Sequence, residues 1–308
     1  MRTLNAQLFW PLMLVFLHAE ASHAEQKVEQ KNGPWNWGIQ GGVVHQFDTD
    51  MSDTDGNFSL DRYLFQSSVG YAWDRRTSVS LSLGLGEYDY DFSSQANING
   101  EEPWDTVREY RVSVPIRFKS SKNTNVVLIP GIVSRAEKGA SIGDGRSERL
   151  LAGISWTLSD TLTIGPGFGW SNTLGGGSSL FPIILLDWSI TENLSLTTGS
   201  AAAASSGPGL SLNYDLSKDW QVSVAVRKEK TRFVLDDKGA IPDGFGKDEN
   251  IPVHVSLQYM VWKKTEVSAF VSSKFEGEVL LEDSQRNNIA RSDYDVAYAI
   301  GLTFKNRF

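Results

Sequence analysis

Large apolar residues alternate with small or polar ones along most of this chain. The clearest case runs from Tyr294 to Phe308, where every second residue up to Phe304 is apolar and the residues between are mostly small or polar. A period of two is that of a β-strand with one apolar face. About 14 segments follow it, although 126–135 contains Pro130 and 194–198 is short. They are 35–43, 63–73, 79–85, 110–118, 126–135, 150–158, 162–170, 180–190, 194–198, 210–216, 220–226, 251–261, 267–275 and 294–308.

The connections between these segments alternate between short and long. Short ones lie near 74–76, 119–125, 159–160, 191–193, 217–219 and 263–265, and long ones near 48–57, 93–103, 136–148, 171–178, 203–208, 236–250 and 282–293. Barrels of the bacterial outer membrane have short periplasmic turns and long external loops. A β-sandwich with Greek-key crossovers has no reason to produce this alternation. We therefore predict an all-β, up-and-down antiparallel transmembrane β-barrel of about 14 strands, with 12 to 16 compatible with the pattern.

Aromatic residues gather at the short-turn ends of the segments, in phase with the apolar face. Rings of this kind sit at the headgroup level of a bilayer, so we predict a periplasmic aromatic girdle. Its members are Trp35, Trp37, Trp73, Trp156, Trp188, Trp220 and Phe308. Trp262 lies at the same height but in the opposite phase, and the pattern alone does not explain it.

Composition agrees with an exported barrel. The mean hydropathy of −0.26 looks soluble, but a barrel presents only alternate residues to lipid. Residues 1–24 resemble a secretory signal peptide, with the apolar stretch 8–17 and small residues at Ser22 and Ala24. Residues 25–34 are polar and predict a disordered periplasmic lead-in, which leaves 35–308 as one barrel domain. The chain has no cysteine and a net charge of −8, which argues against a disulfide scaffold and against nucleic acid as a partner.

With its terminal Ile300-Gly301-Leu302-Thr303-Phe304 and final Phe308, the chain resembles bacterial outer-membrane β-barrels of the porin type, and most of all barrel families of unknown function. The resemblance implies a bacterial cell outer-membrane location and contact with membrane lipid and lipopolysaccharide. It also implies recognition of the last strand by the barrel assembly machinery. No cofactor is expected, and the oligomeric state stays open. A plug-like N-terminal segment, as in long-chain fatty-acid transporters, is not evident.

The residues between the apolar positions should face the lumen. Most are small and polar, but charges of both signs occur among them and are candidates to line a pore. These are Arg62, Glu109, Arg111, Arg117, Asp187, Arg227, Glu229, His254, Lys274 and Glu276. They could form a structural network or a selectivity filter. We expect a passive channel for small solutes. A channel for hydrophobic compounds, suggested by Phe181, Ile183 and Leu185, and a structural or adhesive barrel are alternatives.

Two further kinds of chemistry have weak support. Asp48, Asp50, Asp53 and Asp55 resemble a calcium loop in composition, but their spacing departs from the alternate-position rule and no glutamate closes the loop. His45, next to this loop, could serve as a base in an omptin-like or phospholipase-like enzyme. No GxSxG motif accompanies it, so we expect no enzymatic activity.

Overall fold

A computed structural model of the chain describes residues 34–74, 76–98, 101–199 and 209–308. The predicted signal peptide and nearly all of the predicted lead-in lie outside these ranges. No helix of the described residues is long and apolar enough to cross a membrane.

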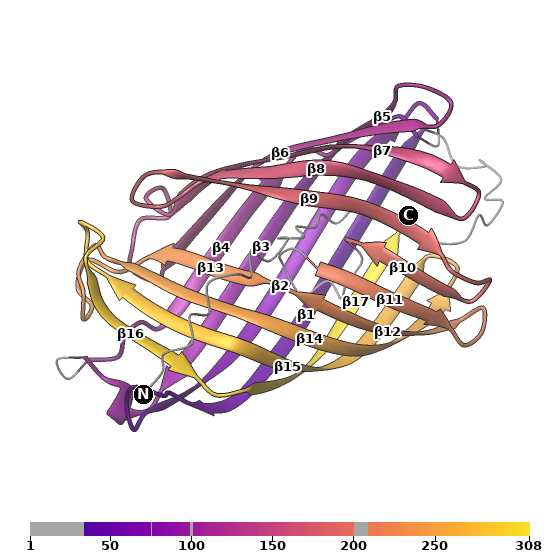
Figure 1. The fold of residues 1–308 in the computed structure, drawn as a ribbon. Coiled ribbons are helices and arrows are strands. Elements are labelled where there is room, and N and C mark those ends of the chain that lie inside the picture. Colours follow the sequence, from indigo (N-terminus) through magenta and orange to yellow (C-terminus); the bar gives the residue numbers. More distant parts are fainter. Residues whose placement is uncertain (1–33, 75, 99–100, 200–208) are drawn as a thin grey trace, which may run out of the picture.

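The described residues form one continuous sheet, with a single turn of 3-10 helix, η1 (Ser94–Ala96), in one loop (Figure 1). The strands are β1 (Trp35–Asp50), β2 (Asn57–Ala72), β3 (Ser78–Phe92), β4 (Thr106–Ser113), β5 (Ile116–Lys119), β6 (Thr124–Glu137), β7 (Arg146–Ser159), β8 (Leu162–Asn172), β9 (Ser178–Ser189), β10 (Leu194–Thr198), β11 (Gly209–Asp215), β12 (Trp220–Arg227), β13 (Glu229–Val234), β14 (Phe245–Trp262), β15 (Thr265–Glu282), β16 (Asn288–Tyr294) and β17 (Ala297–Arg307).

The sheet closes on itself. Each wall strand pairs antiparallel with its neighbours in sequence, and β1 pairs with both β2 and β17. Three wall strands are interrupted, so that β4 and β5, β12 and β13, and β16 and β17 each count once in the wall. At the first break Pro115 cannot donate to the ladder. The result is a closed, up-and-down barrel of 14 strands, which confirms the predicted fold class.

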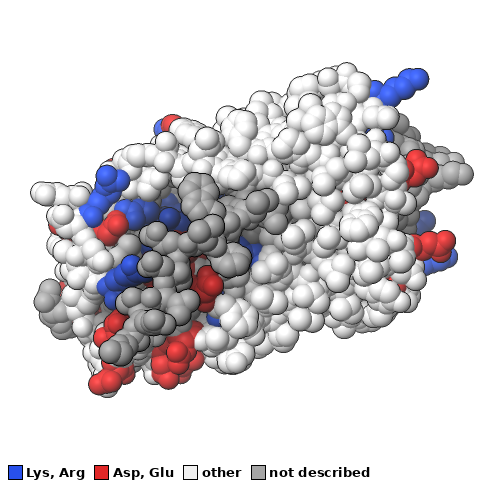
Figure 2. Space-filling view, viewed as in Figure 1, with Lys and Arg blue, Asp and Glu red and all other residues white. Residues whose placement is uncertain are grey.

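The outer surface carries the apolar side chains. Leu83 in the middle of β3 is 48% exposed and Leu302 on β17 is 56% exposed, as expected for residues that face hydrocarbon. In Figure 2 charged residues gather toward the two ends of the molecule, and the surface between them is largely uncharged. All the aromatic residues predicted for the girdle are exposed, namely Trp35, Trp37, Trp73, Trp156, Trp188, Trp220 and Phe308.

A β-bulge explains the phase of Trp262. The register between β14 and β15 shifts between Met260 and Trp262, and Trp262 then pairs with Thr265. One extra residue in a strand reverses the direction of the side chains that follow. Trp262 is therefore 72% exposed, on the same surface as the girdle.

The outer half of the barrel is filled on one side by an apolar core. Side chains of β2, β3 and β4 meet those of β13, β15 and β16, so the core spans the lumen from wall to wall. Phe233 of β13 lies with its ring centroid 5.2 Å from that of Trp104, and Phe58 of β2 lies 5.1 Å from Tyr294. Its fully buried members include Phe58, Leu60, Tyr88, Trp104, Val107 and Phe233.

β13 bends inward to complete this core. It pairs along its length with β14, and at its end Val234 forms a parallel bridge with Ala136 of β6. β6 is not a neighbour of β13 in the wall, because β7 to β12 lie between them in sequence order. The outer end is thus subdivided, and β7, β8 and β9 stand outside the filled part.

Among the residues that the structure describes, the wall is incomplete between β9 and β13. β10 pairs with β9 only from Asp187 to Ser189, and beyond that point Thr198 Oγ1 bonds to the backbone of Leu186. Among the described residues, no strand pairs with the free edge of β9 from Ser178 to Leu185. The connection from β10 to β11 (200–208) lies outside the described residues. We call this part of the wall the lateral gap.

Candidate functional site on the inner wall

The predicted pore-lining residues lie mostly on the inner wall. Arg62, Glu109, Arg227, Glu229, His254 and Lys274 are buried there, and Arg111, Arg117 and Asp187 are partly buried at inward positions of their strands.

Glu276 is the exception and corrects the prediction. It is exposed and has a positive φ of 50°, in a bulge of β15. Before the bulge Lys274 is buried, and after it Val279 and Leu281 are buried, so the inward phase changes at this point. Glu276 therefore does not belong to the inner wall.

Glu109 organises one group of charges. Its carboxylate accepts bonds from Arg135 Nε, on the neighbouring β6, and from Arg111 Nη2 at 2.5 Å. The hydroxyl of Tyr88 donates to the same carboxylate at 3.4 Å. A buried carboxylate is tolerated only when it is paired in this way. This group joins the inner faces of β3, β4 and β6.

Glu229 organises the second group. Arg62 Nη1 of β2 donates to Glu229 Oε2 of β13 at 2.7 Å, and both side chains are almost fully buried. The Arg62 guanidinium also lies 5.4 Å from the ring centroid of Tyr88, which links the two groups. Lys274 of β15 donates to Gln46 of β1 at 2.6 Å. The Arg62–Glu229 ion pair crosses the lumen, because β2 and β13 are not adjacent in the wall.

Among the charged residues of this inner wall, Arg135, Arg149 and Asp248 were not predicted; Asp248 fell in the predicted connection 236–250. Pro130 interrupts the apolar run of segment 126–135, so the sequence does not show which of its residues face inward. In the structure Pro130 is exposed and Val133 is buried, so Val133 and Arg135 face inward. Arg149 immediately precedes Leu150, the first outward apolar residue of the predicted segment 150–158, and period two would have placed it inside.

The two histidines of the described residues lie on opposite faces of the wall. His45 is on the outer surface, with Nδ1 2.7 Å from Asp61, and both side chains are about half exposed. His254 is buried on the inner wall, with its ring edge-on to Phe270. His45 therefore has a carboxylate partner but does not face the lumen.

The four aspartates of the predicted calcium loop do not gather. Asp48, Asp50, Asp53 and Asp55 are all exposed. Within the described ranges no group of three or more His, Asp or Glu residues is placed to hold a metal ion. The calcium-loop interpretation is therefore not supported.

Beside the charges of the inner wall, β7 and β9 carry an apolar cluster at inward positions, which we call the apolar ledge. It consists of Leu151, Phe181, Ile183 and Leu185. The side chains of β9 lie flat because the facing positions are glycines: a Cβ on Gly169 would meet the Phe181 ring at 2.0 Å, and one on Gly167 would meet Ile183 at 2.7 Å. The ledge runs along the strand that borders the lateral gap.

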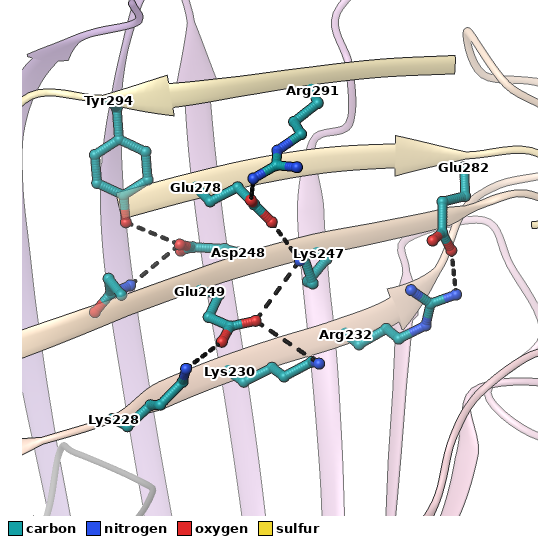
Figure 3. A network of polar contacts seen from close by, with 11 residues as sticks. Lys228, Lys230, Arg232, Lys247, Asp248, Glu249, Glu278, Glu282, Arg291 and Tyr294 are labelled. Atoms are coloured by element: carbon teal, nitrogen blue, oxygen red, sulfur yellow. Dashed lines mark hydrogen bonds and ion pairs between the residues drawn. The ribbon is translucent and has the colours of Figure 1, made fainter. Parts of the chain in front are cut away.

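A different charged network covers the outer end of β13 to β16 (Figure 3). Glu249 of β14 is 2.8 Å from Lys228 and also lies near Lys230 and Lys247. Glu278 binds Lys247 and Arg291, and Glu282 binds Arg232. On the inward side of the same strands, Asp248 accepts bonds from Tyr90 and Tyr294. Such density of charge marks wall that stands beyond the hydrocarbon layer.

Comparisons with known proteins find only distant similarities. No family model matches the chain, and no curated relative was found. Among solved structures, an outer-membrane channel from Pseudomonas putida F1 aligns with a TM-score of 0.49 and 8% identity, over 90% of this chain and 96% of that one. A Pseudomonas aeruginosa FadL homologue aligns with a TM-score of 0.45 and 11% identity over 89% of each chain. The KdgM porin aligns at 0.32 and 10%, over 86% and 97%. The likeness is one of fold.

The closed antiparallel wall, its apolar outer band and the aromatic residues at the short-turn end define the class of this protein. It is a β-barrel of the bacterial outer membrane.

Proposed function

We propose that this barrel is a channel for small solutes, and that they enter through the lateral gap rather than along the barrel axis. The observation that carries the proposal is the edge of β9 that no described strand pairs with, beside an outer end that is filled and capped. In a barrel of this width the interior need not be filled by side chains, so the packed outer core is a specific feature.

The outer core opposes an axial path. Tyr90 and Phe233 come from opposite walls, and their ring centroids are 6.4 Å apart, which leaves no room for water between them.

The loops at the outer end are tied together over this core. Glu137 accepts backbone N–H bonds from Asp105 and Asp236, both at 2.8 Å. The loop between β8 and β9 reaches across as well, since Arg286 donates to the Gly176 carbonyl at 2.8 Å and Leu174 packs on Phe245. These contacts support an outer end that is capped rather than open.

The lateral gap offers the alternative path. A strand edge without a partner exposes backbone groups that are costly in lipid, so natural barrels keep one only where it is covered or functional. Here the edge carries the apolar ledge on its inner side. A solute that passes the edge would meet the partly exposed Phe181 and Leu185 first and then the charged groups around Glu109.

Conductance and flux test the proposal. We expect the purified chain to give single-channel steps in planar bilayers, and proteoliposomes containing it to take up small solutes faster than empty vesicles. If the protein is folded, as judged by its heat-modifiable migration on gels, but gives no conductance and no uptake, the channel is overturned and a structural barrel remains.

A further inference from the structure

The charge of the inner wall is opposite to that of the chain. The whole protein carries a net charge of −8. On the inner wall at mid-height, however, cations outnumber carboxylates. The cations are Arg62, Arg111, Arg135, Arg149, Arg227 and Lys274, and the carboxylates are Glu109, Glu229 and Asp248. A lumen of this sign favours anions over cations.

Arg149 is the least compensated of these cations. It stands between Ser147 and Leu151, which are both buried, at an inward position of β7, yet it is itself exposed. The lumen in front of it is therefore open to water. Within the described part of the chain, no hydrogen bond or ion pair reaches its guanidinium. It is repelled by Arg135 and Arg111 and attracted by Glu109, whose two oxygens already bind those arginines.

The backbone leaves space in front of Arg149. Its cross-strand partner on β6 is Gly131, which is followed on β4 by Ser113. In the row of Arg149, therefore, β6 places no side chain in the lumen. One row further, Val133 of β6 pairs with Arg111, which is partly exposed at 26%. An anion between these two guanidinium groups would reduce their mutual repulsion and accept charge-assisted hydrogen bonds from both.

The apolar ledge begins next to Arg149. Leu151 follows it at the next inward position of β7, and Gly169 and Phe181 continue that row on β8 and β9. A ligand with its anionic group at Arg149 would thus extend its body over Leu151 and Phe181 toward the lateral gap.

We propose that Arg149 and Arg111 form a binding site for organic carboxylates with an apolar body, which the apolar ledge accommodates. The role of this site in transport rests on the proposed function. The site gives the proposed channel a substrate class. Arg149 binds the carboxylate, Arg111 is the second donor, and Arg135 holds Glu109 so that this carboxylate does not compete for Arg149.

Binding of 1-naphthoate to the purified full chain in detergent micelles tests the site. The neutral probe is 1-naphthylmethanol, which has the same ring without the charge, and titrations into empty micelles give the blank. The test variant is Arg149→Gln. The control is Arg146→Gln, on the same strand but at an exposed outward position, where it pairs with Glu148.

We expect naphthoate to bind more tightly than the alcohol, and Arg149→Gln to weaken naphthoate about tenfold or more while leaving the alcohol unchanged. Arg146→Gln should leave both unchanged. Equal binding of the two probes, or equal effects of the two variants, would overturn the site.

Bilayer recordings separate this proposal from the channel itself. In a potassium chloride gradient the wild type should prefer anions, and Arg149→Glu should shift the reversal potential toward cations. Naphthoate binding that depends on Arg149, in a protein without conductance, would retain the site and refute the channel. Conductance with no anion preference and no naphthoate binding would retain the channel and refute the site.

Discussion

The rings of Tyr90 and Phe233 lie 6.4 Å apart, although β3 and β13 belong to opposite sides of the barrel wall. This contact exists because β13 turns inward and pairs with β6. It makes the outer half of the molecule resemble a small, filled barrel, while the inner half keeps the width of a larger one.

The first prediction concerns this core. Phe233 is fully buried, so Phe233→Ala should leave a cavity and lower the free energy of unfolding by about 3–5 kcal/mol. Phe168→Ala, on the lipid face of β8, is the control and should cost clearly less. Urea unfolding of the barrel in lipid vesicles measures both. Equal losses would show that Phe233 does not belong to a packed core.

The second prediction concerns the ledge. Gly169→Val places a branched side chain where the Phe181 ring now lies, so Phe181 must turn into the lumen. Solute uptake by proteoliposomes should fall while the barrel remains closed. Gly143→Val is the matched control, because a Cβ there meets only Ser141 Oγ at 3.5 Å. Unchanged uptake in Gly169→Val would contradict a path along the ledge.

The third prediction concerns pH and the outer loops. Burial raises the pKa of Glu137, at the outer end of β6, although the N–H groups of Asp236 and Asp105 favour its charged form. Its pKa in the folded state is therefore above that in the unfolded chain, so this residue stabilises the fold at low pH, and the contribution is lost as pH rises from about 4.5 through the raised pKa.

Glu137→Gln tests this pH dependence. The glutamine side chain cannot ionise, and it has one acceptor oxygen where the carboxylate has two. At acidic pH the variant should melt at a lower temperature than the wild type. This difference should shrink as the pH rises from about 4.5 through the raised pKa of Glu137. A difference that is constant with pH would show that Glu137 does not titrate in this range.

The fourth prediction concerns the lipid face. Leu83→Arg puts a charge in the middle of the apolar band, and should destabilise the barrel in a bilayer by about 2–4 kcal/mol. Ile142→Arg, in the loop between β6 and β7, should have little effect, since it contacts water. If both substitutions were tolerated equally in vesicles, the outward face of β3 would not be in hydrocarbon.

The wall could be predicted from the sequence because its cause is local. Each strand must present alternate apolar residues to lipid, so period two appears in almost every segment, and the short and long connections fix the order. The inward turn of β13 could not be predicted in this way. Its bridge from Val234 to Ala136 depends on a partner far away in the chain, and Phe233 looks like any other apolar residue of a strand.

The wrong placement of Glu276 and the opposite phase of Trp262 have one physical cause. A bulge adds one residue to a strand and reverses the faces beyond it, and no residue type marks the position. This explains both Trp262, which turned out to be exposed with the girdle, and Glu276, which turned out to lie off the inner wall. Arg149 has a different cause: it lies just before the first apolar residue of its predicted segment, so the apolar pattern does not include it although period two places it inward.

The bridge between β6 and β13 has a consequence for biogenesis. It joins the first half of the chain to the second and adds no wall strand, so it can form only after β14 has placed β13 at the outer end. Assembly of this barrel therefore has two closures, the seam of β1 with β17 and this internal one. A variant that blocks the second should still insert as a complete cylinder, but with a leaky outer end.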